Sequence, residues 1–88
     1  MERREIFDTL VKAMLTELYL EDIKEEDLTE DSALFGEGLG LDSIDSVELV
    51  VIVEKHFKVA IQDADEARKA FASLGVLVSF IQERMPGE

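Results

Sequence analysis

One serine stands out as the residue able to do chemistry. Ser43 directly follows Asp42 and precedes a long apolar run that continues to Phe57. Asp and Ser are both favoured N-cap residues, so we expect a helix to begin here with the Ser43 hydroxyl exposed. The free backbone amides and the dipole at a helix N-terminus favour a bound anion such as phosphate. An exposed serine of this kind, in a small acidic chain, indicates a covalent attachment point.

A nucleophilic catalytic role for Ser43 would require a base within hydrogen-bond reach. The only histidine, His56, lies near the far end of the same expected helix, roughly 20 Å away at the helical rise per residue. The residues 41–45 read Leu-Asp-Ser-Ile-Asp, which is not the Gly-x-Ser-x-Gly nucleophile elbow. We therefore expect no catalytic residue, and we interpret His56 as a helix C-terminal residue whose protonated form suits the dipole.

Metal and nucleotide sites find little support in the sequence. There is no cysteine and one histidine, which argues against a structural zinc site. The acid-rich segment 21–31 lacks the ligand spacing and central glycine of a calcium-binding EF-hand. The glycines of segment 36–40 lack both the Lys-Ser/Thr pair and the preceding strand of a phosphate-binding loop. We expect no metal site and no nucleotide site.

Length and charge narrow the classes of protein further. With 88 residues, the chain is expected to form a single domain, 1–88, with its structured core at about 3–84. The net charge of −12 should repel nucleic acids and anionic lipid, attract basic surfaces of partner proteins, and favour a monomer. No signal-peptide apolar region opens the sequence, and the longest mostly apolar run, 74–81, is too short to cross a bilayer. We therefore expect a cytoplasmic protein without membrane insertion.

Helical spacing marks the first element. Apolar residues recur on one face between about residues 3 and 19, which predicts a core-facing helix. The residues that form this stripe are Ile6, Phe7, Leu10, Val11, Met14, Leu15 and Leu18.

A long polar connection follows, over residues 21–41. Loops of this length are uncommon in compact domains unless they are functional or partly structured. Four apolar residues suggest that it is pinned across the bundle: Ile23, Leu28, Leu34 and Phe35. Glycines at positions 36, 38 and 40 then give the backbone freedom to turn sharply into Ser43.

The second helix is expected at about 43–57, although part of it resembles a strand. Residues 49–53 form an apolar run with four β-branched members, which is typical of a buried strand. The longer apolar pattern and the spacing of Leu49, Val53 and Phe57 favour a helix. On this helix we expect Val47 and Val50 to face the core.

The opposite face of this helix is a candidate docking surface. Ile44 and Val51 are expected near the open side, with Asp45, Glu48 and Glu54 around them. Such a surface suits a partner that carries Arg and Lys around a small hydrophobic pocket. The alternative is a merely solvated helix face, which is usual for charged stretches.

Two more helices complete the expected fold. Val59 and Ile61 should point inward from the connection 58–62, Asp63 should cap a short helix at about 64–71, and Ser73 should cap another at about 74–84. The expected core residues of these helices are Ala67, Ala70, Phe71, Leu74, Leu77, Val78 and Ile81. The fold class is thus all-α, a small four-helix bundle with three longer helices, a short third helix and a long loop between the first two.

The sequence resembles the acyl carrier protein family. That family carries an Asp-Ser-Leu motif at the start of its second helix, and the corresponding residues here are Asp42-Ser43-Ile44, followed by Asp45 and by Val47-Glu48-Leu49-Val50. The order of helices matches over about 3–84, including Phe57 near the end of the second helix. Three departures suggest a specialised member: Ile44 in place of leucine, the glycine-rich segment 35–38, and Gln62 where proline is common.

The resemblance implies a 4'-phosphopantetheine arm linked through its phosphate to Ser43. It also implies that a phosphopantetheinyl transferase (holo-ACP synthase) adds the arm from coenzyme A with magnesium, and that Asp42 assists. The protein itself would not be an enzyme; it would present acyl thioesters to fatty acid or polyketide-type biosynthetic enzymes with basic docking patches, mainly through its second helix and Ile44. Its core could part to shelter an acyl chain.

Two alternatives to this function stay open at this point. A peptidyl or aminoacyl carrier protein would use the same serine. A non-carrier acidic helical module for protein interaction would use Ser43 only as a helix cap.

Overall fold

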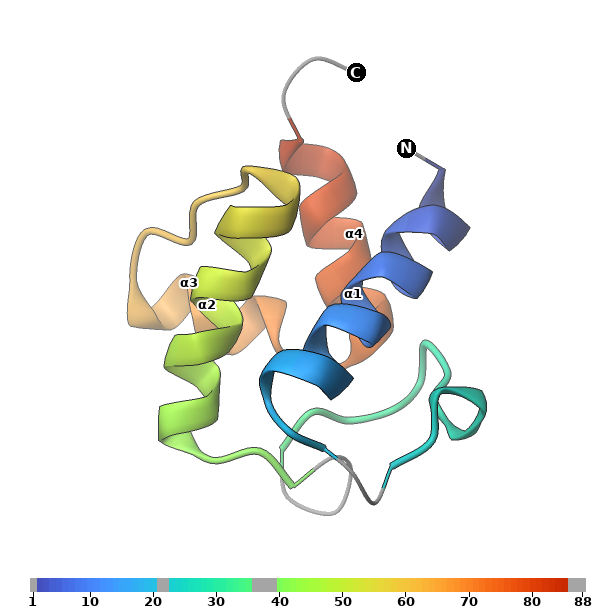
Figure 1. The fold of residues 1–88 in the computed structure, drawn as a ribbon. Helices are drawn as coiled ribbons and strands as arrows, with labels where there is room; N and C mark the ends of the chain where they lie inside the picture. Colours follow the sequence, from blue (N-terminus) through green and yellow to red (C-terminus); the bar gives the residue numbers. More distant parts are fainter. Residues whose placement is uncertain (1, 21–22, 36–39, 86–88) are drawn as a thin grey trace.

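The computed structural model describes residues 2–20, 23–35 and 40–85. In this part of the chain every regular element is a helix, and the only β-type pairings are two isolated bridges. Figure 1 shows the helices gathered around a common centre, with α3 partly hidden behind α2 in this view. The elements are α1 (Arg3–Glu17), the 3₁₀ turn η1 (Glu25–Asp27), α2 (Ser43–Phe57), α3 (Ala64–Ala70) and α4 (Leu74–Arg84). The expected all-α bundle is confirmed.

The helix bounds agree closely with the sequence pattern, and the two differences have local causes. The first helix ends at Glu17 rather than at residue 19, because Tyr19 adopts a left-handed conformation with φ of 55°. The third helix ends at Ala70, one residue early, and Phe71 becomes its C-cap. The strand-like run 49–53 lies within α2, so the helical interpretation is confirmed.

The predicted caps of the last two helices are also present. The side chain of Asp63 accepts a hydrogen bond from the backbone amide of Glu66 at 2.8 Å, and α3 begins directly after it. The hydroxyl of Ser73 accepts one from the amide of Val76 at 3.2 Å at the start of α4. Each cap satisfies an amide that has no partner within its own helix.

The core is built from the predicted apolar faces. α1 packs against both α4 and α2, and α3 packs against α4. The fully buried residues of α1 and α4 are Ile6, Leu10, Val11, Met14, Leu74, Leu77, Val78 and Ile81. Leu18 is also buried, whereas Phe7 and Leu15 are half-buried at the edge of the core. In the segments around α3, Val59, Ala70 and Phe71 are buried, and Ile61 and Ala67 pack against the core from partly exposed positions.

The orientation of α2 corrects one prediction. Val50 is partly buried as expected, but Val47 is 63% exposed and does not join the core. At about 100° per residue, Val47 lies roughly 200° around the helix from buried Leu49, on the opposite face. The inward position is taken instead by Ile52, which is buried.

The long connection is anchored largely as predicted. Leu34 is fully buried, and Ile23 and Leu28 pack against the core. Phe35 is a weaker anchor than predicted, because it is 36% exposed and its ring lies on Phe71 with centroids 6.4 Å apart. Leu41, which the pattern did not single out, is buried and donates its amide to the carbonyl of Leu34 at 3.1 Å.

Of the three glycines expected to help the chain turn toward Ser43, the structure describes Gly40. Gly40 adopts a positive φ of 70°, a conformation that suits glycine and turns the chain toward α2. Gly36 and Gly38, which were also expected to help the turn, lie outside the described residues.

Candidate functional site

Asp42 determines where α2 begins. Its Oδ1 atom accepts hydrogen bonds from the backbone amides of Ile44 at 3.0 Å and Asp45 at 2.9 Å. The amide of Asp42 in turn donates to Oδ2 of Asp45 at 3.2 Å, which completes a reciprocal capping box. Both amides use Oδ1, so the cap does not engage Oδ2 of Asp42.

This cap corrects the expectation of free amides at the start of α2. The amides of Ile44 and Asp45 already bind the Asp42 side chain, and the amide of Ser46 binds the Asp42 carbonyl at 3.0 Å. An anion at this helix end would therefore gain from the helix dipole but would compete with a carboxylate for the amides. The start of α2 is therefore a weaker site for a free anion than the sequence predicted.

Ser43 is the first residue of α2 and is exposed. Its carbonyl accepts a hydrogen bond from the hydroxyl of Ser46 at 2.7 Å, which adds a contact within the first turn. The backbone of Ser43 is thus held by the helix while its side chain faces solvent. This placement matches the expected exposed hydroxyl, and the role of Ser43 as an attachment point stays a prediction.

The structure separates Ser43 from the only histidine. α2 runs without interruption from Ser43 to Phe57, which places His56 at its opposite end, roughly 20 Å away at 1.5 Å per residue. The Nε2 atom of His56 lies 2.6 Å from Oε2 of Glu17, at the end of α1. A serine–histidine pair is therefore absent from this helix.

An apolar groove lies beside Ser43, between α2 and α3. Its volume is about 610 Å³. The apolar residues that line it are Phe35, Leu41, Val47, Val50, Ile61, Ala64, Ala67 and Phe71. Asp42, Ser43 and Ser46 line it from the start of α2, and Asp63 and Arg68 line it from the neighbourhood of α3. A flexible group attached to Ser43 would thus have an apolar surface next to its point of attachment.

The predicted docking residues lie along α2. Ile44 is 70% exposed and Val51 is 56% exposed, and Val47 joins them on the same face. Glu48 and Glu54 are exposed, and by helical geometry they flank this apolar face on its two sides. Asp45 is half-buried and takes part in the cap, so it is less available to a partner than predicted.

Val47 is the surface residue that the sequence pattern missed. Its distance of two positions from Leu49 contained the signal, because residues two apart on a helix do not share a face.

Within the described residues, no three His, Cys, Asp or Glu side chains are arranged to hold a metal ion. None of the helices in the described ranges is both long and apolar enough to cross a membrane.

Comparison with known proteins gives a consistent result. Residues 8–81 match the family described as "Phosphopantetheine attachment site". The chain is 38% identical over 77 residues to the acyl carrier protein of Wolinella succinogenes, covering 88% of this chain and 93% of the relative. It is 35% identical over 83 residues to that of Thermotoga maritima, covering 94% and 95%. The acyl carrier protein of Phenylobacterium zucineum is 42% identical over 64 residues, covering 73% and 77%.

The local structure fits the group that this family binds. An exposed hydroxyl on a well-capped first turn is accessible to a modifying enzyme, and the adjoining groove offers an apolar wall. These matches cover most of the chain and most of each relative. The chain belongs to the acyl carrier protein family, whose cofactor is a covalently attached 4'-phosphopantetheine.

Proposed function

We propose that this protein carries acyl intermediates as thioesters on a 4'-phosphopantetheine arm attached to Ser43. The observation that carries this proposal is the exposure of Ser43 at the first position of α2, directly after the Asp42 cap. We further propose that it acts in the cytoplasm as a monomeric single domain and catalyses no reaction itself. The enzymes that receive its cargo would be of the fatty acid or polyketide type.

Each residue at the start of α2 has a distinct part in this proposal. The Oδ1 atom of Asp42 fixes the first turn and so fixes the backbone that bears the Ser43 hydroxyl. Oδ2 of Asp42 lies outside the cap and is the atom we assign to the transferase step, in which magnesium takes part. The attached arm supplies a terminal thiol, which is the group that bears the acyl chain.

The exposed face of α2 is the proposed docking surface for the transferase and for the acyl-transferring enzymes. Ile44, Val47 and Val51 would enter a small apolar pocket of the partner. Glu48 and Glu54 would meet basic residues at the rim of that pocket, with Asp45 contributing from the first turn. Charged residues at such a rim mainly raise the association rate and select the partner.

The groove between α2 and α3 is proposed to shelter part of an acyl chain. Its apolar lining lies beside Ser43, so an attached chain could fold back without crossing solvent over a long distance. Removing such a chain from water is favourable by roughly 0.8 kcal/mol for each buried methylene.

Mass spectrometry of the intact protein tests the attachment. The unmodified protein would be incubated with coenzyme A, magnesium and a broad-specificity phosphopantetheinyl transferase. We expect a gain of one phosphopantetheine group in the wild type and in Ser46→Ala, and no gain in Ser43→Ala. Ser46 is a matched control because it lies on the same helical turn and lines the same groove.

Three other outcomes would each contradict part of this proposal. No gain in the wild type with several transferases would reject the carrier function and favour the acidic interaction module. A gain that persists in Ser43→Ala would reject Ser43 as the attachment point. Loading of the arm with amino acids rather than acyl groups by cognate enzymes would favour a peptidyl or aminoacyl carrier.

A further inference from the structure

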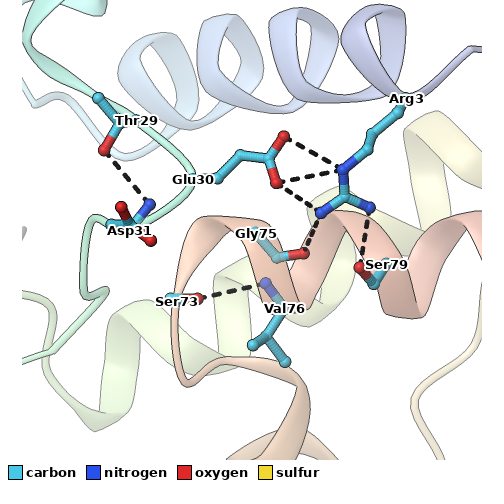
Figure 2. Close-up of polar contacts among 8 residues, drawn as sticks. All are labelled: Arg3, Thr29, Glu30, Asp31, Ser73, Gly75, Val76 and Ser79. Atoms are coloured by element: carbon cyan, nitrogen blue, oxygen red, sulfur yellow. Dashed lines mark hydrogen bonds and ion pairs between the residues drawn. The ribbon is translucent and has the colours of Figure 1, made fainter.

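Arg3 joins three parts of the molecule that are far apart in the sequence (Figure 2). Its Nε atom lies 3.1 Å from each carboxylate oxygen of Glu30, and its Nη2 atom lies 2.6 Å from Oε1 of the same residue. Nη2 also donates to the carbonyl of Gly75 at 3.0 Å, and Nη1 donates to the hydroxyl of Ser79 at 2.8 Å. One guanidinium thus ties the start of α1 to the long connection and to α4.

The connection approaches α4 very closely at this junction. The amide of Gly75 donates to the carbonyl of Glu30 at 2.8 Å. A Cβ atom on Gly75 would lie 2.9 Å from both the Cβ and the carbonyl oxygen of Glu30, closer than non-bonded atoms tolerate. A glycine within a helix is unfavourable relative to alanine, so its presence here is explained by this close approach.

The pairing with α4 continues along the connection. The amide of Leu74 donates to the carbonyl of Ser32 at 3.0 Å, and Ala33 forms an isolated bridge with Ser73. Segment 30–33 is therefore bonded to the first turn of α4 at successive points. The first amides of α4, which have no partner within the helix, are satisfied by this segment.

The same segment leads to the start of α2. Leu34 follows it directly, is fully buried, and accepts a hydrogen bond from the amide of Leu41 at 3.1 Å. Leu41 is buried as well and immediately precedes the Asp42 cap. A continuous set of bonds thus runs from Arg3 through Glu30 and Leu34 to the residues that place Ser43.

We propose that Arg3 is a positioning residue for Ser43, acting through Glu30 and the close packing at Gly75. The junction keeps the connection seated on α4, and the seated connection holds the start of α2 in one orientation toward the transferase. When the junction is broken, only a fraction of molecules present Ser43 correctly, and the apparent affinity for the transferase falls by that fraction. This inference rests on the proposed attachment at Ser43.

A purely structural role for Arg3 makes a different prediction. Loss of global stability alone lowers the melting temperature but leaves the loading kinetics unchanged at temperatures where the protein remains folded. Loss of positioning raises the KM of the transferase for this protein and leaves kcat unchanged, because each correctly presented molecule still reacts at the normal rate. Measuring KM and kcat separately therefore distinguishes a positioning role of Arg3 from a purely structural one.

The experiment measures arm transfer to the full unmodified chain at varied concentration, well below its melting temperature. We expect Arg3→Gln and Gly75→Ala each to raise KM about threefold or more without changing kcat. Gly75→Ala changes no charge, so it excludes a direct charge contact between Arg3 and the transferase. Arg3→Lys retains the charge but cannot form the planar fork with Glu30, so it should also raise KM.

Arg84→Gln is the matched control. It removes another arginine that pairs with a glutamate, here Glu66 of α3, away from the connection. Its KM should equal that of the wild type. Hydrogen exchange provides a second readout, because the amides of Leu41 and Leu74 should exchange faster in Arg3→Gln and Gly75→Ala but not in Arg84→Gln.

Failure of this inference can be distinguished from failure of the proposed function. If the wild type accepts no arm, the attachment at Ser43 is wrong, and the exchange rates alone then decide whether the junction holds the connection. If the wild type is loaded and the folded Arg3→Gln and Gly75→Ala variants show wild-type KM, the positioning role is overturned. It is overturned as well if Arg3→Gln raises KM while Gly75→Ala does not.

Discussion

The carboxylate of Glu17 lies 2.6 Å from Nε2 of His56, so the C-terminal ends of α1 and α2 meet in a polar contact. Nζ of Lys55 also donates to Glu17, at 3.0 Å. The hydrogen bond to His56, followed by that to Lys55, holds the pKa of Glu17 below its ordinary value. The sequence predicted a role for His56 at the helix end but not this partner.

The contact at Glu17 predicts a pH-dependent contribution to stability. A carboxylate whose pKa is lowered by folding stabilises the folded state above its unfolded pKa, about 4.3 for Glu, and loses this effect as the pH falls through the folded value. We expect the wild type to melt at a higher temperature than Glu17→Gln at about pH 5, and the difference to shrink toward about pH 3. Thermal melts across this range measure it.

Glu83→Gln is the control for this pH series, because it removes an exposed carboxylate from α4. In a chain of net charge −12, removing such a charge should leave stability unchanged or raise it slightly. A difference between wild type and Glu17→Gln that stays constant from about pH 5 to about pH 3 would contradict the predicted role of the Glu17 carboxylate.

The face of α2 that contacts the core was only partly predictable from sequence. Residues 49–53 are all apolar, so this run carries no information on which side is inward. Spacing identified Leu49, Val53 and Phe57 correctly, and its period also places Val47 on the face opposite Leu49. Which helix covers the inward face, here α1, is a tertiary relationship that a local pattern does not contain.

The exposure of Val47 predicts separate effects on stability and on docking. Val47→Ala should change the free energy of unfolding by about 0.5 kcal/mol or less, as usual for surface substitutions. Val53→Ala, at a fully buried position of the same helix, should lower it by about 1.5–3 kcal/mol. Chemical denaturation of the two variants measures this contrast, and equal losses would show that Val47 packs in the core.

Docking is measured on the same Val47 variant. Val47→Ala should raise the KM of the phosphopantetheinyl transferase about fivefold, because Val47 lies at the centre of the proposed docking surface, where the few residues that cost about 1 kcal/mol or more on truncation cluster. Val76→Ala is the control, since Val76 is an exposed valine on α4 rather than on α2. Identical KM values for Val47→Ala and Val76→Ala would remove Val47 from the proposed docking surface.

The two oxygens of Asp42 can be tested separately. Asp42→Asn keeps Oδ1 as an acceptor for the amides of Ile44 and Asp45, so the melting temperature should change little. It replaces Oδ2 with an amide nitrogen, which cannot bind magnesium, and we expect arm transfer to slow by about tenfold or more. Asp42→Ala should in addition lose about 1 kcal/mol of stability with the cap.

Melting and single-turnover transfer assays on both Asp42 variants distinguish these effects. Normal transfer rates in a stable Asp42→Asn protein would limit the role of Asp42 to helix capping. A melting temperature that falls equally in both variants would show that Oδ1 is not the atom that stabilises the first turn.

The structure of the long connection was only partly predictable from the sequence. Its apolar anchors were recognisable, and three of the four are buried or packed against the core. The junction of Arg3, Glu30 and Gly75 was not recognisable from the sequence, because these residues are distant from one another in the chain and nothing in their types marks them as partners. One signal was present: a glycine inside an expected helix often marks the close approach of another backbone, and Gly75 is such a residue.

The net charge of −12 predicts that salt stabilises this protein. The molecule measures 35 × 26 × 21 Å, so at an ionic strength of about 0.01 M, where the screening length is about 30 Å, acids across the whole surface repel one another. At about 0.15 M the screening length falls to about 8 Å and this repulsion is largely removed. Salt also weakens exposed ion pairs such as Arg3–Glu30, but the excess of 21 acidic over 9 basic residues makes repulsion the larger effect.

Melting temperatures should therefore rise as sodium chloride is added, and magnesium chloride should act at lower concentration because it binds carboxylates as a divalent ion. A variant in which the exposed acids of η1 are neutralised, Glu25→Gln/Glu26→Gln/Asp27→Asn, should melt higher at low salt and respond less to both salts. A melting temperature that stays flat or falls with added salt would show that the ion pairs outweigh the repulsion. An equal response in the neutralised variant would show that salt does not act through these surface charges.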